Sequence, residues 1–229
     1  MTDDVAALLP GARADSLLLT EVYASVQGES TFTGVPLVLV RTARCNLRCT
    51  WCDSAFTFRG GERRPLADVL AEVAGFGLTH VLVTGGEPLL QPSVLPFMSA
   101  LCDAGQTVLL ETGGSLDISA VDARVHRIVD VKCPGSGEHE RNHWANLARL
   151  GVRDELKFVV ADRADYEWAR DVVIRERPTE RGVTVLFSPV WGDAALPAQI
   201  AEWLVEDRLP ARLQIQLHKV LWPPDERRR

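Results

Sequence analysis

The chain has 229 residues, of which 46% are hydrophobic, and a formal net charge of −6. This size and apolar content fit one large domain or two small ones, and no apolar run approaches the roughly 18 residues that a membrane span requires. The acidic balance disfavours a broad phosphate-binding face and therefore a nucleic-acid partner.

Short apolar runs alternate with helical patterns along the chain. The helical spacing is clearest over residues 66–74, where apolar residues recur at i, i+3, i+4, i+7 and i+8 and glycines follow. In chain order, the pattern predicts strands at 17–24 and 36–41, a helix at 66–74, a strand at 80–84, a helix at 94–104, strands at 107–111 and 127–132, a helix at 140–150, a strand at 155–160, a helix at 165–177, a strand at 183–188, a helix at 198–209 and a strand at 213–218.

This alternation implies right-handed βαβ units and a parallel sheet. About six or seven such units, with one short connection near residues 117–124, are too few for a closed eight-fold barrel, which typically needs about 250 residues. We therefore predict an α/β fold, an incomplete and open parallel (β/α) barrel, with a flat doubly wound sheet as the alternative. In both architectures ligands bind at the carboxyl ends of the strands.

The cysteine count and the N-terminus indicate the compartment. The chain has five cysteines, an odd number, and its N-terminus is acidic without an apolar signal core. Both features argue for a reducing cytoplasm and against a disulfide framework. Because no repeat, low-complexity segment or linker is present, we expect a single domain over residues 1–229, with about 1–15 and 225–229 as loose tails.

Three of the cysteines, Cys45, Cys49 and Cys52, lie within eight residues in the spacing C-x3-C-x2-C. Thiolates suit soft metals and iron–sulfur clusters. A structural zinc site wants four ligands, whereas this loop supplies three. A cubane cluster held by three cysteines leaves one iron open to bind a small molecule through an amine and a carboxylate. The spacing favours the cluster, and a zinc site completed by a distant His or Cys is the alternative.

Polar and glycine-rich motifs follow several predicted strands at the same edge of the sheet. These motifs are the cysteine loop, Thr84-Gly85-Gly86-Glu87-Pro88, Glu111-Thr112-Gly113-Gly114-Ser115, Asp130-Val131-Lys132-Cys133-Pro134-Gly135 and Ser188-Pro189-Val190-Trp191-Gly192. Random loops would not gather such residues at one edge, so this edge is predicted to be an active site. By contrast, Asp165 is interpreted as part of the solvated face of a helix.

The cysteine loop and the Thr84–Pro88 motif resemble those of radical S-adenosylmethionine enzymes. A narrower resemblance, to the 7-carboxy-7-deazaguanine synthase family, covers about residues 21–224. It is carried by Gln27-Gly28-Glu29, Arg41, Cys45-Asn46-Leu47, Trp51-Cys52-Asp53-Ser54, Asp130-Val131-Lys132-Cys133-Pro134 and Gln216-Leu217-His218-Lys219. The resemblance implies conversion of 6-carboxy-5,6,7,8-tetrahydropterin to 7-carboxy-7-deazaguanine with loss of ammonia, for queuosine and other 7-deazapurines. The cofactors it implies are a 4Fe-4S cluster, S-adenosylmethionine and Mg²⁺.

The resemblance also implies roles for individual residues. The expected cluster ligands are Cys45, Cys49 and Cys52, and the expected magnesium ligand is Ser54. The expected substrate-binding residues are Val26, Gln27, Gly28, Glu29, Arg41 and Thr84. The expected S-adenosylmethionine-binding residues are Trp51, Asp53, Gly86, Glu87, Glu111, Lys132, Cys133, Ser188 and Trp191. The partners implied are an electron donor such as flavodoxin or ferredoxin and a second copy of the chain in a homodimer.

The sequence departs from the family pattern at three places. Gly113 stands where Asn is common, Ser54 where Thr is common, and five residues follow Pro224, whereas in some members a terminal carboxylate near this position reaches substrate. Two other functions remain as alternatives. A glycyl-radical-enzyme activase would share the cysteine and glycine motifs but would not need Gln27, Glu29 and Arg41. A zinc-stapled interaction module would not be an enzyme.

Overall fold

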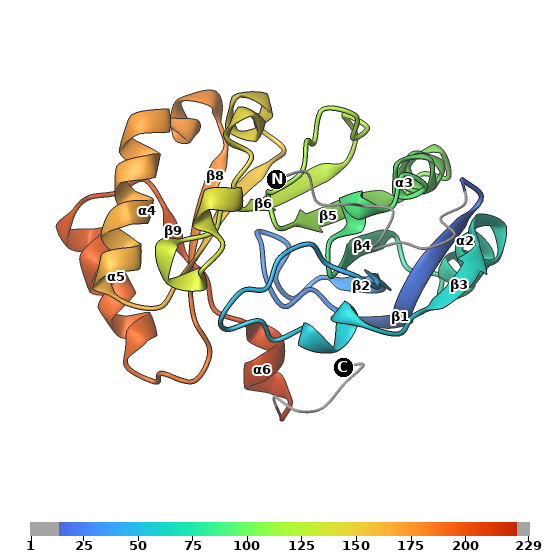
Figure 1. The fold of residues 1–229 in the computed structure, drawn as a ribbon, viewed down its shortest axis with the longest axis horizontal. Coiled ribbons are helices and arrows are strands. Elements are labelled where there is room, and N and C mark those ends of the chain that lie inside the picture. Colours follow the sequence, from blue (N-terminus) through green and yellow to red (C-terminus); the bar gives the residue numbers. More distant parts are fainter. Residues whose placement is uncertain (1–13, 224–229) are drawn as a thin grey trace.

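The computed structural model describes residues 14–223 and contains a nine-stranded sheet (Figure 1). Its strands are β1 (Ser16–Val26), β2 (Pro36–Thr42), β3 (Glu62–Pro65), β4 (His80–Gly85), β5 (Thr107–Thr112), β6 (His126–Asp130), β7 (Glu155–Val160), β8 (Thr184–Pro189) and β9 (Arg212–Leu213). Its α-helices are α2 (Leu66–Gly75), α3 (Val94–Asp103), α4 (Arg163–Glu176), α5 (Leu196–Glu206) and α6 (Leu217–Leu221). The remaining connections contain short 3-10 turns.

The strand order confirms an open barrel. It runs β3-β1-β2-β4-β5-β6-β7-β8-β9, and each neighbouring pair from β2 to β9 is parallel. Because this order does not reverse, right-handed crossovers place their helices on one face, and the switch point of a doubly wound sheet is missing. Within residues 14–223, β3 and β9 end the sheet without pairing with each other, so the barrel is incomplete.

The two faces of the sheet follow from the period of two along each strand. Outward residues such as Val40, Val83 and Phe158 pack with α2, α3, α4 and α5 in the main core. Inward residues form a smaller apolar layer, made of Leu37, Leu82, Leu109 and Ile128. Nearer the carboxyl ends, the inward positions of β2, β4, β5 and β6 are polar or charged, and so is one inward position of β7: Arg41, Thr84, Glu111, Asp130 and Lys157. The sheet therefore carries a polar layer above an apolar floor.

The predicted helix at 140–150 is wrong. This segment forms two 3-10 turns, His139–Arg141 and Trp144–Arg149. The reason is that its asparagines bind neighbouring loops. The Asn142 amide pairs with both the N–H and the C=O of Lys132, at 2.9 Å each. Asn146 accepts from the Ile118 N–H at 3.2 Å. Such side-chain bonds to the backbone compete with a regular helix.

The predicted strand at 213–218 is also wrong. Only Arg212–Leu213 pairs with β8, and the chain then turns into α6. The turn follows from a different backbone partner, because the Leu217 N–H donates to the Gly28 carbonyl at 2.8 Å. Strand β3, which pairs antiparallel with β1, was not predicted. The other predicted elements lie within three residues of the observed bounds.

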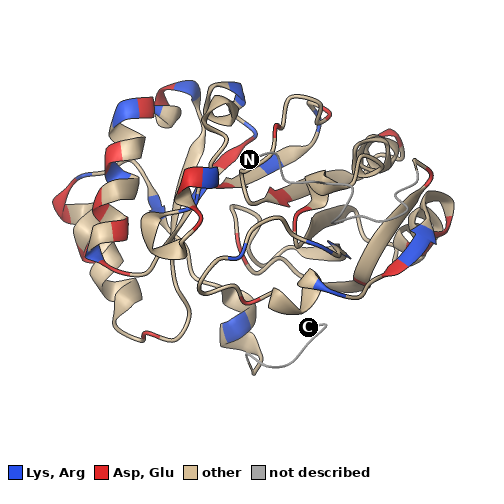
Figure 2. Ribbon diagram, viewed as in Figure 1, with Lys and Arg blue, Asp and Glu red and all other residues tan. Residues whose placement is uncertain are grey.

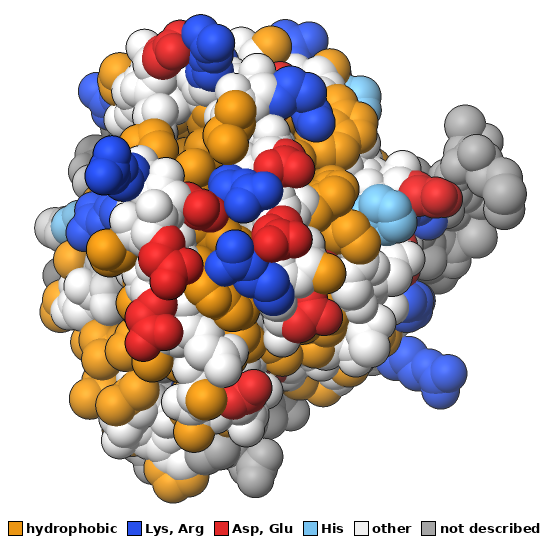
Figure 3. All heavy atoms as spheres, turned by 90° about the vertical axis from the view of Figure 1, so that its left-hand side faces the viewer, with side chains coloured by type: hydrophobic (Ala, Val, Ile, Leu, Met, Phe, Trp, Pro, Cys, Tyr) orange, Lys and Arg blue, Asp and Glu red, His pale blue; other side chains and the backbone are white. Residues whose placement is uncertain are grey.

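Charged residues of both signs are distributed along the outer helices α4 and α5 (Figure 2). The face over α4 and α5 intersperses basic, acidic and apolar groups (Figure 3), with ion pairs such as Arg163–Glu167 and Arg170–Asp207. This face therefore carries no extended field of one sign. Among the described residues, no helix is long and apolar enough to cross a membrane. Residues 1–13 and 224–229 lie outside the described part of the chain. The predicted tails fall mostly in these two ranges, and so do the residues after Pro224.

Candidate active site

A cavity of about 580 Å³ opens at the carboxyl ends of the parallel strands. Leu39, Leu82 and Ile128 from the inner face contribute to its apolar wall. All residues predicted for the site line this cavity except two, Glu87 and Cys133, which are buried behind its wall. The geometry therefore brings together the cysteine loop, the Gln27-Gly28-Glu29 segment and the ends of β4, β5, β6 and β8.

The cysteine loop follows β2 and is held by backbone contacts from other loops. The Thr50 N–H donates to the Ser136 carbonyl at 3.0 Å, and the Arg48 N–H donates to the Glu138 carboxylate at 2.6 Å. Gly86 packs so closely that a Cβ there would collide with the Arg44 carbonyl. This close approach explains the glycine directly after β4.

The three thiols of the loop fit an iron–sulfur cluster better than a zinc ion. All five cysteines of the chain are free, and Cys45, Cys49 and Cys52 line the same cavity. Among residues 14–223, no three His, Cys, Asp or Glu side chains converge as ligands of a single ion would. A cluster has no such requirement, because each of its thiolates binds a different iron. Burial raises the pKa of the Cys45 thiol to about 12, so a bound metal would have to stabilise the thiolate.

Glu87 holds two loops together behind the cavity wall. Its buried carboxylate accepts from the Gly113 N–H at 2.7 Å, the Leu89 N–H at 3.0 Å and the Thr112 hydroxyl at 2.9 Å. A Cβ at Gly113 would lie 3.1 Å from Leu47 Cδ1 and 3.3 Å from a Glu87 oxygen. A larger residue at 113 would therefore require these neighbours to shift. Glu87 thus connects the segment after β4 to the Thr112–Gly113 loop, and its side chain does not line the cavity.

The turn after β6 connects the cysteine loop to α4. Cys133 is buried in the main core, so its side chain packs and only its backbone lies near the site. The Asp165 carboxylate accepts from the Gly135 N–H at 2.8 Å and the Ala161 N–H at 3.2 Å. Asp165 is 2% exposed, so its interpretation as a solvated residue is wrong. It anchors the turn that supports the cysteine loop.

Glu29 is the centre of a polar network in the part of the cavity wall that the β1–β2 loop, β7 and the C-terminal segment form. One oxygen accepts from Gln216 Nε2 at 2.7 Å, and the other from Lys157 Nζ at 2.6 Å and Gln214 Nε2 at 3.1 Å. Burial would raise the pKa of Glu29, but the Lys157 ammonium holds it below its ordinary value. The Gly28 backbone lies against α6, since a Cβ there would collide with the His218 ring.

Arg41 of β2 and Glu111 of β5 line the cavity on either side of β4. Arg41 Nε donates to the buried Glu21 carboxylate at 2.8 Å, and Nη2 lies 3.5 Å from the Tyr23 hydroxyl. Glu111 accepts from Gln27 Nε2 at 3.3 Å and from the Thr84 hydroxyl at 3.0 Å. Burial and the nearby Glu29 charge raise the pKa of Glu111. The raised pKa favours the protonated form of Glu111, which can donate as well as accept a hydrogen bond.

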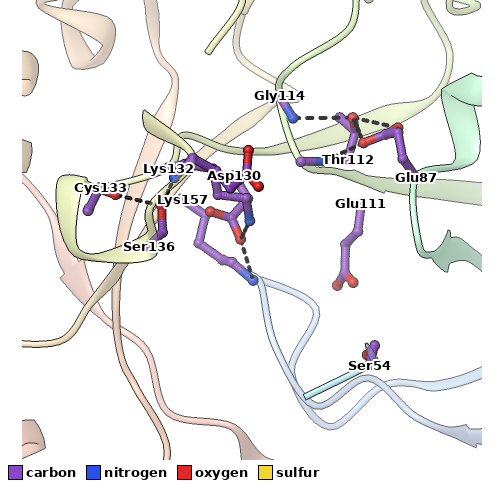
Figure 4. Close-up of polar contacts among 12 residues, drawn as sticks. Ser54, Glu87, Glu111, Thr112, Gly114, Asp130, Lys132, Cys133, Ser136 and Lys157 are labelled. Carbon is purple, nitrogen blue, oxygen red and sulfur yellow. Dashed lines mark hydrogen bonds and ion pairs between the residues drawn. The ribbon is translucent and has the colours of Figure 1, made fainter. Parts of the chain in front are cut away.

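A series of side chains of alternating charge runs from Glu29 to the end of β6. Lys132 Nζ lies 3.0 Å from Asp130 Oδ2, and Lys157 Nζ lies 3.7 Å from the same oxygen (Figure 4). Both ammonium groups are largely buried, with side chains 15% and 11% exposed. Carboxylates on either side compensate for the loss of water.

Asp53 and Ser54 lie beside the cysteine loop. The Ser54 hydroxyl donates to Asp53 at 3.1 Å, and Lys219 Nζ lies 2.8 Å from the other Asp53 oxygen. Burial would raise the pKa of Asp53, but the Lys219 ammonium outweighs this effect and lowers it. Ser54 precedes the 3-10 turn Ala55–Phe58 without capping it through its side chain. Its hydroxyl is therefore not committed to the turn.

Several residues that line the cavity were not predicted as site residues: Tyr23, Lys157, Gln216, His218 and Lys219. The sequence did contain a signal for Lys157. It stands between two apolar residues of β7 that face the main core, and alternation along a strand then turns its side chain to the inner face. For Gln216, His218 and Lys219, the only signal in the sequence was their place in a motif of the family resemblance. Their place in the wall depends on how the C-terminal segment folds back.

Comparisons with known proteins agree with this geometry. A family model for the radical SAM superfamily matches residues 39–134. The chain is 43% identical to the 7-carboxy-7-deazaguanine synthase of Koribacter versatilis, over 90% of this chain and 97% of that relative. It is 42% identical to the synthase of Chlorobaculum tepidum, over 92% of this chain and 96% of that relative.

Solved structures share the fold. QueE from Escherichia coli is similar with a TM-score of 0.72 at 23% identity, over 88% of this chain and 94% of that one. Streptococcus suis SuiB bound to S-adenosylmethionine is similar with a TM-score of 0.52 at 14% identity, over 75% of this chain and 44% of that one. With the three-thiol loop and the polar cavity wall, the sequence identities show that this chain belongs to the 7-carboxy-7-deazaguanine synthase family of the radical SAM superfamily.

Proposed function

We propose that the protein converts 6-carboxy-5,6,7,8-tetrahydropterin to 7-carboxy-7-deazaguanine and ammonia, for queuosine-type 7-deazapurine biosynthesis. The observation that carries this proposal is one cavity lined both by the three-cysteine loop and by Gln27, Glu29 and Arg41. A glycyl-radical activase would not need those three residues, and its substrate is a protein. Relatives at 42–43% identity over most of the chain favour the synthase over that activase.

The chain's own residues are suited to hold such a substrate. A pterin edge presents ring N–H and amino donors together with a carbonyl acceptor, which Glu29, Gln27 and backbone groups can pair. Its carboxylate suits the guanidinium of Arg41, which Glu21 already orients. The product and ammonia together contain the atoms of the substrate, so the conversion is redox neutral overall.

The cofactors would bind at the part of the cavity wall that contains the cysteine loop. Cys45, Cys49 and Cys52 would hold the 4Fe-4S cluster. Trp51, Asp53, Gly86, Glu111, Lys132, Ser188 and Trp191 would contact S-adenosylmethionine, and Glu87 and Cys133 would support that wall from behind. When bound, this pair supplies an adenosyl radical that removes a hydrogen atom from the substrate. The polar layer would orient the pterin toward that wall, and the apolar floor would exclude water beneath it.

We propose that an electron donor of the flavodoxin or ferredoxin class docks near the cysteine loop. We also propose that the enzyme works in the cytoplasm. The segment 41–64 contains six Arg and two acidic residues, in a chain whose net charge is −6. Arg48 and Arg59 are exposed beside the cysteine loop. An acidic carrier would be attracted to this segment. The free thiols are compatible with a reducing compartment.

The first prediction concerns the cluster. After anaerobic reconstitution, Cys45→Ala, Cys49→Ala or Cys52→Ala should lose most of the bound iron and acid-labile sulfide, because two thiolates cannot hold the cluster firmly. Cys102→Ala is the matched control, since Cys102 packs against the main core from α3. A Cys49→Ala protein with full cluster content would contradict the assignment.

The second prediction separates substrate recognition from cofactor binding. Glu29→Gln keeps the shape of the side chain but removes its charge, and should weaken pterin binding by on the order of 2–5 kcal/mol. Dithionite-driven cleavage of S-adenosylmethionine should persist. Arg41→Lys should also lose product formation, while its ammonium still compensates the buried Glu21. The exposed Glu62→Gln on β3 is the control. Loss of S-adenosylmethionine binding in Glu29→Gln would show that the assignment is wrong.

The third prediction concerns magnesium. We assign Ser54 as the single protein ligand, because Mg²⁺ keeps octahedral oxygen coordination and most of its waters, and the substrate can supply further oxygens. Ser54→Ala should keep the cluster and S-adenosylmethionine binding but lose most of the stimulation by Mg²⁺. Ser54→Thr offers the same hydroxyl oxygen and should retain the stimulation by Mg²⁺. An Ala variant that responds to Mg²⁺ like the parent enzyme excludes this ligand.

The fourth prediction concerns self-association. We propose a homodimer formed through the outer edge of β9 and through α6, where Leu213, Ile215, Val220 and Leu221 are 37–62% exposed. An unpaired strand edge beside apolar side chains favours pairing with a second copy. Light scattering after size exclusion should give a dimer mass, and Val220→Glu with Leu221→Glu should give a monomer. Ile174→Glu on α4 is the exposed control. A monomeric parent protein would overturn the proposal.

A further inference from the structure

Lys157 is a charged residue inside a strand that is otherwise suited to the core. Its neighbours on β7, Leu156 and Phe158, point outward into the main core. The alternation of the strand therefore turns Lys157 inward, where its side chain is 11% exposed and lines the cavity. Removing an ammonium from water in this way costs free energy unless carboxylates compensate for it.

The ammonium of Lys157 lies between two walls of the cavity. On one side it lies 2.6 Å from Glu29, which comes from the loop between β1 and β2. On the other side it lies 3.7 Å from Asp130, which ends β6 and pairs with Lys132 at 3.0 Å. Figure 4 shows Lys157 beside Asp130 and Lys132. The loop carrying Glu29 and the end of β6 are thus connected through one side chain.

The other hydrogen bonds to the Glu29 carboxylate come from the neutral amides of Gln214 and Gln216. Other charged or titratable groups also act on it: Asp53 of the cysteine loop, Glu111 of β5 and His218 of α6. Two of these, Asp53 and Glu111, are acids. Without the Lys157 charge, a buried Glu29 among such neighbours would take up a proton more readily. A protonated carboxyl would offer a donor where a pterin edge also presents donors.

We propose that Lys157 is a positioning residue for substrate recognition, which holds the Glu29 carboxylate ionised and oriented toward the pterin edge. The inference rests on the proposed function, in which Glu29 binds the substrate. Lys157 acts through Glu29 and need not touch the reacting atoms. It should therefore control the affinity and the pH dependence of pterin binding more than S-adenosylmethionine binding.

The test is equilibrium binding to the reconstituted protein with S-adenosylmethionine and without reductant, so that no adenosyl radical forms, and the probe is the fluorescent compound 6-carboxypterin. Lys157→Met should raise the Kd for this probe at pH 7 by on the order of 30-fold. Lys157→Arg should recover much of the affinity, because it restores a cation beside Glu29. The Kd for S-adenosylmethionine should stay near that of the parent protein in both variants.

The pH dependence distinguishes this role from a general loss of stability. In the parent protein Glu29 stays ionised through neutral pH, so its contribution to binding should change little between pH 6 and 8. In Lys157→Met the pKa of Glu29 is no longer held down, so affinity should be lowest at acid pH and recover as the pH rises. His218 is present in all variants and interacts with Glu29, and the Glu29→Gln protein shows how the pH profile changes when Glu29 cannot titrate. Arg127→Met is the control, because it breaks the buried Arg127–Asp154 pair outside the cavity.

A double substitution completes the test. If Lys157 acts through Glu29, adding Lys157→Met to Glu29→Gln should weaken binding little further. An additive loss, or a Lys157→Met protein with the parent's Kd and pH profile, overturns the inference and leaves the proposed function standing. If the parent protein binds no 6-carboxypterin and makes no product, the proposed function fails and the inference fails with it.

Discussion

The structure depends on compensating several charged side chains inside a sheet. An isolated buried charge is costly, so each must have a partner of opposite sign or a set of hydrogen bonds. Here the partners come from different strands and loops: Lys157 with Glu29, Lys132 with Asp130, and Arg41 with Glu21. These pairs tie the inner ends of the strands to one another. The cavity is polar and ordered without depending on any single loop.

The same principle explains how the cysteine loop is held. Besides hydrogen bonds within the loop, it is positioned by segments distant in sequence, through the Ser136 carbonyl and the Glu138 carboxylate. Those segments are fixed in turn by Asp165 on α4 and by the amide of Asn142. Three thiols without their own regular structure thereby face a defined cavity. A change in these supporting residues would move the three thiols without touching them.

The departures from the family pattern are explained in part by this packing. Gly113 sits against Leu47 and Glu87, so the absence of a side chain lets the β5 loop lie close to the cysteine loop. Ser54 keeps the hydroxyl that Thr would supply and lacks only the methyl group. The assignment of the two walls to substrate and cofactor is a proposal, supported by the positions of Glu29 and Arg41 relative to the thiols.

The sequence by itself determined most of the strands and most of the helices, because periodicity depends on local spacing. It also identified the cysteine loop and the polar motifs at strand ends. Only the tertiary structure decided which distant residues meet. Asn142 and Asn146 formed loop contacts in place of a helix, and α6 folded back onto Gly28 in place of a strand. Lys157 became the partner of Glu29 for the same reason. The contacts of Lys157 with Glu29 and of Leu217 with Gly28 join residues more than a hundred positions apart, and those of Asn142 and Asn146 join separate loops, so no local pattern encodes these pairings.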